Sequence, residues 1–414
     1  MAAVAETTPK TAQAGLFRNR TFLSIWLGHT ISIIGDGFHS VALGLWVLQT
    51  TGSSTAMATI MAVRALSGVL LGAVAGTVVD RTDRRRMMIG TDLIRFVLVL
   101  AVAALVMRPG ASFAVILALS ALISIAGQFF GPAMNASLVN IVGKESLQQA
   151  SGLLQMTNTL AQVLGPFLGG TVVALWGGWV ALTADAVSFL ISAVFILLGG
   201  YFASPRVEKE QTSFWGDLKE GLRFIKGHSL ARGVVTFAPA INLFGNALGG
   251  VLLPVIVVKV WHATAFEFGL AEAAFPLGFA IGAGLLMAFA TKLRRRGYIM
   301  FGGLLLASVL MTVVPLMPST LPAIPIYVFS GLFLAFPNVI FMVTLQSEIP
   351  TEVQGRVFGM LGSLLSATAP LAFLVAGPLA DIFSPVHVSL AFGFGLVLTC
   401  LSGLVTAPAL RDYN

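Results

Sequence analysis

Seven polar side chains interrupt long apolar stretches of this sequence: Asp36, Arg64, Asp185, Asn242, Asn246, Glu272 and Asn338. A charge in apolar surroundings is costly, so a group of this kind is a candidate functional residue. A carboxylic acid held there can exchange a proton near neutral pH, and a carboxylate can bind a cation. Amides can orient a ligand by hydrogen bonding. These residue types therefore predict proton exchange and ligand binding.

The composition indicates that these residues lie within a membrane protein. Of 414 residues, 57% are hydrophobic and only 10% are charged, whereas a soluble domain carries about 25% charged residues. So little polar surface cannot cover a water-soluble globule, which excludes a large soluble enzyme. The single cysteine excludes an internal disulfide, and we find neither a metal-binding HExxH nor a nucleotide-binding GxxxxGK[ST] pattern.

Twelve stretches are long enough to cross a bilayer as helices of about 20 residues. They are residues 21–48, 55–79, 87–107, 112–142, 147–175, 179–202, 230–258, 266–290, 298–317, 322–347, 356–380 and 386–407. Most of the 24 Lys and Arg residues fall on the side of these spans that also holds both termini. Basic residues mark the cytoplasmic side, so we expect both termini in the cytoplasm. The net charge of +7 then reflects topology, and we expect no nucleic-acid partner.

The spans divide into two halves separated by a polar segment. We expect a cytoplasmic tail at 1–20, a six-helix bundle at 21–202, a cytoplasmic linker at 203–229, a second bundle at 230–407 and a tail at 408–414. In the linker, Phe214, Leu218 and Ile225 share one helical face. This spacing favours an amphipathic helix on the membrane surface, with a solvated linker as the alternative.

An internal repeat relates the two halves. Aligning 278–296 with 68–86 matches two glycines and the arginine triplet, and the same shift places Asn246 on Asp36. The sequence therefore predicts an all-α fold with twelve transmembrane helices in two pseudo-symmetric six-helix bundles.

Asp36 and Arg64 lie at similar depths in the first two spans, about 18 Å and about 14 Å below the outer surface. An ion pair between them would lower the cost of burying either charge. Three possibilities stay open. Asp36 titrates or binds a cation while Arg64 adjusts its proton affinity, the pair is permanent and structural, or the two residues do not touch.

Two further carboxylic acids are candidates. Asp185 lies about two turns into the sixth span, where it could face a cavity or make local helix contacts. Glu272 lies about one to two turns into the eighth span, where an outer vestibule could reach it. Asn242 and Asn246 are four residues apart and therefore share a helix face.

Other ionisable residues give weaker indications. His29 and His39 could each carry a proton near neutral pH, but both also suit ordinary polar contacts between helices. Asp92 and Arg95 are three residues apart. We expect them to pair with each other or with the basic loop that precedes them.

The segment GTVVDRTDRRRM (76–87) resembles the loop signature of the major facilitator superfamily between its second and third spans. The matching residues are Gly76, Asp80, Arg81, Arg84 and Arg85, while Asp83 replaces the usual glycine. The resemblance implies a charge cluster that holds the cytoplasmic side shut and separates when that side opens. A basic loop that only sets topology is the alternative.

The segment GLLQMTNTLAQVLGPFLGG (152–170) resembles the antiporter motif of drug exporters in the same superfamily. The matching residues are Gly152, Gly165, Pro166, Gly169 and Gly170, with Ala161 at the position of another glycine. Such a segment forms a kinked helix with a smooth face. Generic packing of small residues is the alternative.

The combined motifs resemble the drug:proton antiporter branch that contains macrolide, multidrug and siderophore exporters. The fourth span, ISIAGQFFGPAMN, lacks the arginine that many proton antiporters carry there. The resemblance implies proton-coupled export of amphipathic organic compounds by alternating access. The alternatives are an importer or uniporter of a small polar solute or metal ion, and a non-transporting membrane sensor or scaffold. We expect a monomer in the cytoplasmic membrane, with the lipid bilayer, protons and a small-molecule substrate as partners, and with no enzymatic activity, cofactor or bound metal.

Overall fold

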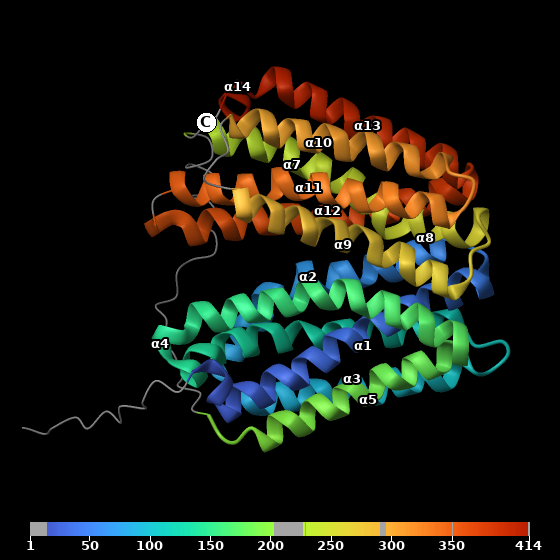
Figure 1. Cartoon of the computed structure of the whole chain (residues 1–414). Coiled ribbons are helices and arrows are strands. Elements are labelled where there is room, and N and C mark those ends of the chain that lie inside the picture. The colour runs from blue at the N-terminus through green and yellow to red at the C-terminus, as the bar shows by residue number, and fades with distance from the viewer. Residues whose placement is uncertain (1–14, 203–226, 228, 290–294, 350, 413–414) are drawn as a thin grey trace, which may run out of the picture.

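The computed structural model describes residues 15–202, 227, 229–289, 295–349 and 351–412, and this part of the chain is helical apart from short connections. Figure 1 shows two groups of helices, one from each half of the chain. The start of α1 and the C-terminal helix lie at the same end of the molecule, which we call the inner end. The opposite end, where α1 ends and α2 begins, is called the outer end.

The first half begins with a short 3-10 helix, Leu16–Arg18, and continues with α1 (Arg20–Thr51), α2 (Ser54–Arg81), α3 (Arg84–Val106), α4 (Phe113–Trp176) and α5 (Gly178–Leu198). The second half contains α7 (Ser229–Ala247), η2 (Leu248–Leu252), α8 (Leu253–Val255), η3 (Ile256–Val260), α9 (Ala265–Phe289), α10 (Arg296–Val313), η5 (Val314–Leu316), α11 (Thr320–Glu348), α12 (Thr351–Ile382), α13 (Pro385–Thr406) and α14 (Pro408–Arg411).

One continuous helical segment, α4, contains two of the predicted spans. Its 64 residues would extend about 96 Å as a single helix, about three times the apolar thickness of a bilayer. Gly143 divides it, because its φ of 76° lies in the left-handed region that glycine adopts without strain. In the described residues, eleven helices are long and apolar enough to span a membrane. With α4 counted as two spans, the predicted twelve-helix fold is confirmed.

Side-chain caps fix where several helices begin. The Asn19 side chain accepts a hydrogen bond from the Phe22 amide at 3.0 Å at the start of α1, and Ser53 caps α2 in the same way. Asp83 accepts from the Arg86 amide at 2.9 Å at the start of α3. With φ at −69°, this position does not require glycine, and aspartate satisfies a free helix-end amide instead. The departure from the family pattern therefore gives α3 a cap.

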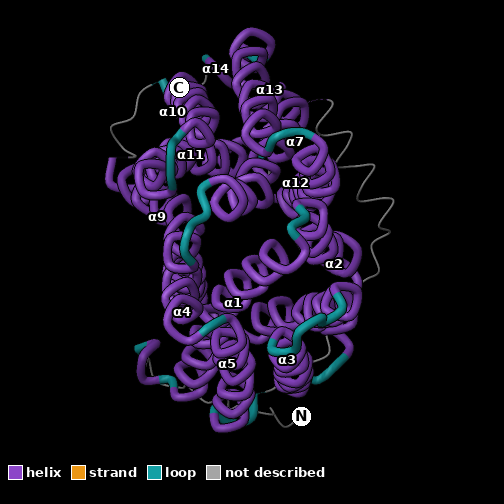
Figure 2. The backbone as a smooth tube through the Cα atoms, turned by 90° about the vertical axis from the view of Figure 1, so that its right-hand side faces the viewer, coloured by secondary structure: helices purple, strands orange, loops and turns teal. Residues whose placement is uncertain are grey.

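The two halves meet along two pairs of helices. Within the first half, α1 packs on α4 and α5, and within the second half α9 packs on α11 and α7 packs on α12. Between the halves, α4 packs on α9 and α2 packs on α12, and Figure 2 shows these two contacts on opposite sides of the molecule.

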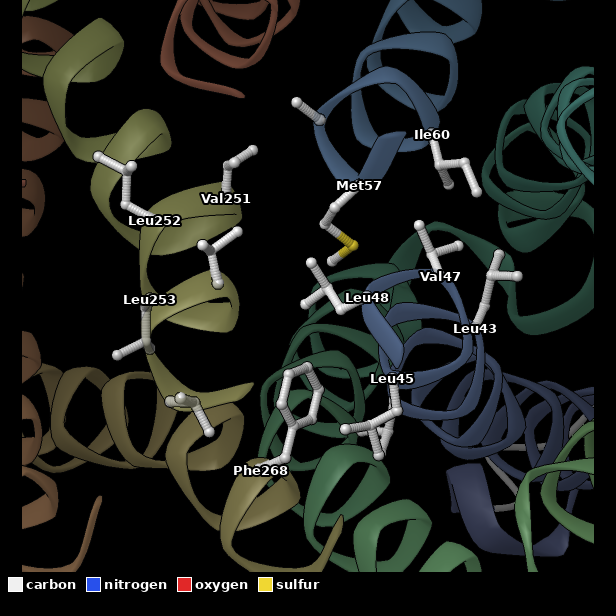
Figure 3. Packing of buried hydrophobic residues seen from close by; sticks show 14 of the residues in the cluster. Leu43, Leu45, Val47, Leu48, Met57, Ile60, Val251, Leu252, Leu253 and Phe268 are labelled. Atoms are coloured by element: carbon white, nitrogen blue, oxygen red, sulfur yellow. The ribbon is translucent and has the colours of Figure 1, made fainter. Parts of the chain in front are cut away.

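An apolar cluster joins the halves at the outer end. Figure 3 shows Leu48 of α1, Met57 of α2, Leu252 of η2 and Phe268 of α9 in this cluster, and each is at most 3% exposed. Burying such side chains contributes about 1.5–3 kcal/mol each relative to exposure. This cluster keeps the two halves together at the outer end in the present conformation.

Two expectations concern the polar segments. Most of the linker 203–229, including the residues of the expected amphipathic helix, lies outside the described residues, as do 1–14 of the expected N-terminal tail. The expected C-terminal tail, 408–414, contains the one-turn helix α14, whose Leu410 is buried.

Candidate functional site

A cavity of about 590 Å³ lies between the two halves. Its walls come from α1 and α4 of the first half and from α9 of the second half. The polar residues that line it are Asp36, Gln155, Asn158, Gln162 and Glu272. One carboxylic acid from each half therefore faces the same space.

A second cavity, of about 540 Å³, lies among helices of the second half. It reaches from Gly233 and Leu410 near the inner end to Met311 and Tyr327. Phenylalanine and methionine make up much of its wall, namely Phe237, Phe275, Phe301, Phe341, Met300, Met311 and Met342. Such a wall suits an apolar ligand that a few polar groups orient.

Four of the residues singled out from the sequence line this second cavity: Asn242, Asn246, Glu272 and Asn338. The amide of Asn242 donates to the Ala238 carbonyl oxygen at 3.0 Å, and that of Asn246 donates to the Asn242 carbonyl oxygen at 2.8 Å. Both amides are thereby held on one helix face. Glu272 and Pro276 line both cavities, so the two cavities meet at this turn of α9.

Asp36 pairs with an arginine other than the expected one. Arg95 Nη2 of α3 donates to Asp36 Oδ1 at 2.5 Å. The Asp36 side chain is 36% exposed and the Arg95 side chain only 12%, so the aspartate faces the cavity and the arginine lies behind it. The Arg95 guanidinium also lies 3.8 Å from the centre of the Phe189 ring, a favourable cation–π contact.

The expected pair between Asp36 and Arg64 is not formed. Depth along the membrane normal gives no information about the direction in which a side chain points around its helix. The long Arg95 side chain reaches Asp36 although α3 packs mainly on α4 and α5. Arg64 instead interacts electrostatically with Glu272 of the other half. The guanidinium of Arg64 forms no hydrogen bond or ion pair within the described part of the chain.

The expected pair between Asp92 and Arg95 is also wrong. Arg95 is bound to Asp36, and Asp92 is fully buried with no hydrogen-bond partner for either carboxyl oxygen among the described residues. Neither residue contacts the basic loop in that part of the chain.

Asp185 lies away from both cavities. It is fully buried, and its Oδ2 lies 3.1 Å from Nδ1 of His39, which is itself only 6% exposed. The pair joins α5 to α1. His39 thus makes the polar contact between helices that was expected. His29 instead stacks on Phe130 with ring centroids 5.5 Å apart, and its Nδ1 has no hydrogen-bond partner among the described residues.

The residues of the loop motif make their contacts within the first half. Arg84 is buried, donates to the Ala136 carbonyl oxygen at 2.7 Å and lies 3.8 Å from Asp80. Arg85 donates to the Leu197 carbonyl oxygen at 2.8 Å. Gly76 and Arg81 have no such bonds among the described residues, and the bonds given above for Arg84 and Arg85 stay within the first half. The gating role therefore stays a prediction.

The glycines of the second motif allow close helix contacts at its outer part. A Cβ atom at Gly165 would lie 3.0 Å from the Gly37 Cα atom, and one at Gly169 would lie 2.9 Å from the Phe38 Cα atom, so α4 approaches α1 closely. A Cβ atom at Gly170 would lie 2.6 Å from the Ala265 carbonyl oxygen of the other half.

The reverse contact comes from Gly269 of α9, where a Cβ atom would lie 2.3 Å from the Pro166 carbonyl oxygen. Gly152, at the other end of the motif, has no neighbour within 4 Å of its Cβ position. The motif thus contacts the second half through Pro166 and Gly170.

An outer contact between the halves was missed from the sequence. Asp381 of α12 accepts hydrogen bonds from the backbone amides of Ser54 at 2.7 Å and Thr55 at 2.8 Å, and from Lys259 Nζ at 3.2 Å. The sequence does indicate that a helix begins here, because serine and threonine residues such as Ser53, Ser54 and Thr55 are typical of a helix start. No feature of the sequence pointed to a capping carboxylate from the other half.

Comparison with known proteins relates the chain to membrane transporters. The family model described as Major Facilitator Superfamily matches residues 25–371. Macrolide efflux protein A of Streptococcus pyogenes is 23% identical over 401 residues, which cover 94% of this chain and 96% of that protein. The multidrug efflux pump Tap of Mycobacterium tuberculosis is 28% identical over 391 residues, which cover 92% of this chain and 91% of that protein.

Solved structures share the fold at lower identity. The nucleoside transporter NupG has a TM-score of 0.71 at 15% identity and covers 95% of this chain and 100% of its own. A bacterial homologue of the iron transporter ferroportin has a TM-score of 0.69 at 17% identity and covers 94% of this chain and 99% of its own. With the family model matching most of its length, the chain belongs to the Major Facilitator Superfamily and is a multi-pass membrane transporter of small molecules, not an enzyme.

Proposed function

We propose that this transporter exports amphipathic organic compounds across the cytoplasmic membrane in exchange for protons. The observation that carries the proposal is the meeting of the two cavities at Glu272, with Asp36 opposite it in the space between the halves. An apolar wall with a carboxylate at its end suits a molecule that combines an apolar body with a positive charge.

The mechanism is alternating access by rocking of the two halves around this space. The present conformation is closed at the outer end by the apolar cluster, by the contacts that Gly170 and Gly269 make across the halves, and by the hydrogen bonds of Asp381. The second cavity extends toward the inner end, where Gly233 and Leu410 line it. With both termini in the cytoplasm, as the distribution of Lys and Arg favours, a substrate enters from the cytoplasm in this state.

The printed names of the relatives, a macrolide efflux protein and a multidrug efflux pump, support export over import. Asp36 supports the coupling to protons, because it is a partly exposed acid within the membrane whose partner is a single arginine. The transporter acts as a monomer in this proposal.

The test is uptake by purified protein in proteoliposomes under an imposed pH gradient. Erythromycin, a macrolide with a basic amine, and tetraphenylphosphonium, a permanent cation, serve as substrates. We expect accumulation that depends on the gradient and that is lost in Asp36→Asn. Uptake of a sugar or a divalent metal ion, with none of the two amphipathic cations, would instead establish the importer or uniporter of a polar solute.

A further inference from the structure

Asp92 is a buried acid that the transport mechanism described above does not use. Its side chain is 0% exposed, and neither carboxyl oxygen has a hydrogen-bond partner in the part of the chain that the structure describes. Ser192 of α5 is the hydroxyl that faces it, and this hydroxyl also lacks a hydrogen bond there. An ionised carboxylate is costly in such surroundings. The neutral acid therefore fits these surroundings better than the carboxylate does.

Arg95 lies one helical turn further along the same helix. Residues three apart share a face of a helix, so the guanidinium can reach Asp92 after a change of side-chain rotamer. In the present conformation its Nη2 atom is bound to Asp36, and its Nε atom has no partner among the described residues. One arginine thus lies between an acid that faces the cavity and an acid that does not.

Three other ionisable groups, all on α1, lie near this arginine. Asp36 is bound to it, and His39 is paired with Asp185 of α5. His29 is stacked on Phe130, and its Nδ1 has no hydrogen-bond partner among the described residues. The part of α4 that crosses the membrane beside α3, 113–142, contains no ionisable side chain. Arg95 is consequently the cation available to Asp92.

We propose that Asp92 is the group that releases the proton when a cation binds, and that it competes with Asp36 for Arg95. This inference rests on the proposed exchange of an organic cation for a proton. When a cation binds at Asp36, it replaces the guanidinium there, and Arg95 turns to Asp92. The O–H bond of Asp92 then breaks and an ion pair between Arg95 and the Asp92 carboxylate forms. Because Asp92 does not line the cavity itself, its proton leaves past Arg95 and Asp36 to water in the cavity.

The charges balance in both states. Before binding, the Asp36 carboxylate balances Arg95, and Asp92 is neutral. After binding, the cation balances Asp36, and the Asp92 carboxylate balances Arg95. One positive charge enters the site and one leaves it, so the buried region stays neutral throughout. The arginine in this exchange comes from α3. The fourth predicted span, 112–142, contains no arginine.

The test measures proton release when tetraphenylphosphonium binds to the purified full-length protein in weakly buffered detergent with a pH indicator. We expect about one proton per cation in the wild type, and an affinity that rises about tenfold per pH unit because binding and proton release are linked. Asp92→Asn, which is isosteric with the neutral acid, should bind the cation without releasing a proton and without this pH dependence. Ser389→Ala removes a buried hydroxyl that also lacks a hydrogen bond among the described residues but lies in the other half, so this control should behave like the wild type.

Infrared spectroscopy tests the same site without depending on the cation. The cation-free wild type at neutral pH should show a C=O stretching band of a protonated carboxyl group that is missing from Asp92→Asn. Absence of that band from the wild type overturns the proposal. Proton release that persists in Asp92→Asn also overturns the proposal. Proton release that is lost only in Asp185→Asn overturns it as well.

Transport separates this inference from the proposed function. If the wild type binds the cation and releases a proton but proteoliposomes transport nothing, the proposed function fails and the site stands. If the wild type accumulates the cation under a pH gradient and Asp92→Asn does so equally well, the proposed function stands and the role of Asp92 in proton release is wrong.

Discussion

The carboxylate of Asp381, near the end of α12, accepts a hydrogen bond from the backbone amide of Ser54, the first residue of α2, at 2.7 Å. The first amides of a helix have no partner within the helix, and a negative charge is favourable beside them. Here the cap comes from the opposite half of the transporter. The hydrogen bond exists only while the halves are together at the outer end, so it stabilises one conformation rather than the fold of either half.

Replacing Asp381 with alanine should therefore shift the transporter toward the state that is open to the outside. Loss of a helix cap costs about 1 kcal/mol, which changes the ratio of the two states about fivefold. The measurement is the rate at which a membrane-impermeant maleimide labels Met57→Cys from the outside, in a Cys400→Ala background. Met57 is only 3% exposed in the present conformation, so faster labelling reports opening.

The matched control is Glu267→Ala. Glu267 accepts from the Thr264 amide at 2.8 Å, so it caps α9 within its own half. This variant should leave the labelling rate at Met57→Cys unchanged. Equal acceleration by both variants would mean that loss of any cap loosens the protein, and the role of Asp381 in outer closure would be wrong.

A second prediction concerns the contact between α4 and α9. A side chain at Gly269 would meet the Pro166 carbonyl oxygen at 2.3 Å, and backbone atoms cannot move aside as a side chain can. Overpacking of this kind costs about 1–3 kcal/mol, so Gly269→Val should slow transport in proteoliposomes by about tenfold or more by preventing outer closure. Gly284→Ala, on the same helix with no neighbour within 4 Å, should transport normally. A normal rate in Gly269→Val would contradict the importance of this contact.

The sequence was sufficient to predict the fold because length, apolar character and the distribution of Lys and Arg are local properties of each span. It also showed that Asn242 and Asn246 share a face, since helical spacing alone determines this. Depth in the membrane was not sufficient to pair Asp36, because it leaves open which way a side chain points around the helix. Arg95 is the partner because α3, rather than α2, presents its arginine to α1.

The remaining site contacts join residues that are far apart in the chain. His39 and Asp185 are 146 positions apart, and no spacing rule relates them. The shared position of Glu272 in both cavities likewise depends on how α9 packs against α4. Contacts of this kind follow from tertiary packing, which the pattern of one sequence does not contain.

The buried pair of His39 and Asp185 should contribute to stability. In Asp185→Ala the imidazole of His39 keeps no partner at Nδ1, and an unsatisfied buried polar group costs about 1–3 kcal/mol. Thermal unfolding in detergent should show this loss, and His39→Ala combined with Asp185→Ala should lose less than the sum of the two single variants. Strictly additive losses would show that the two side chains do not interact in solution.

The last prediction separates cations from neutral substrates at Glu272. This carboxylate lies where the two cavities meet, and the nearby charge acting on it is that of Arg64. Glu272→Gln removes the attraction for a cation but keeps the shape of the cavity. It should weaken tetraphenylphosphonium binding about tenfold, which corresponds to about 1.4 kcal/mol, and should leave the binding of the uncharged drug chloramphenicol unchanged.

The opposite change tests the sign of the effect. Arg64→Gln removes a positive charge near the same carboxylate, so it should strengthen tetraphenylphosphonium binding, again with no effect on chloramphenicol. Isothermal titration calorimetry on purified protein measures all four combinations of variant and ligand. If both variants weaken both ligands equally, the substitutions act through packing, and Glu272 is not the group that attracts the cation. Opposite shifts for the cation alone require a direct electrostatic role, because packing does not distinguish a charged ligand from a neutral one.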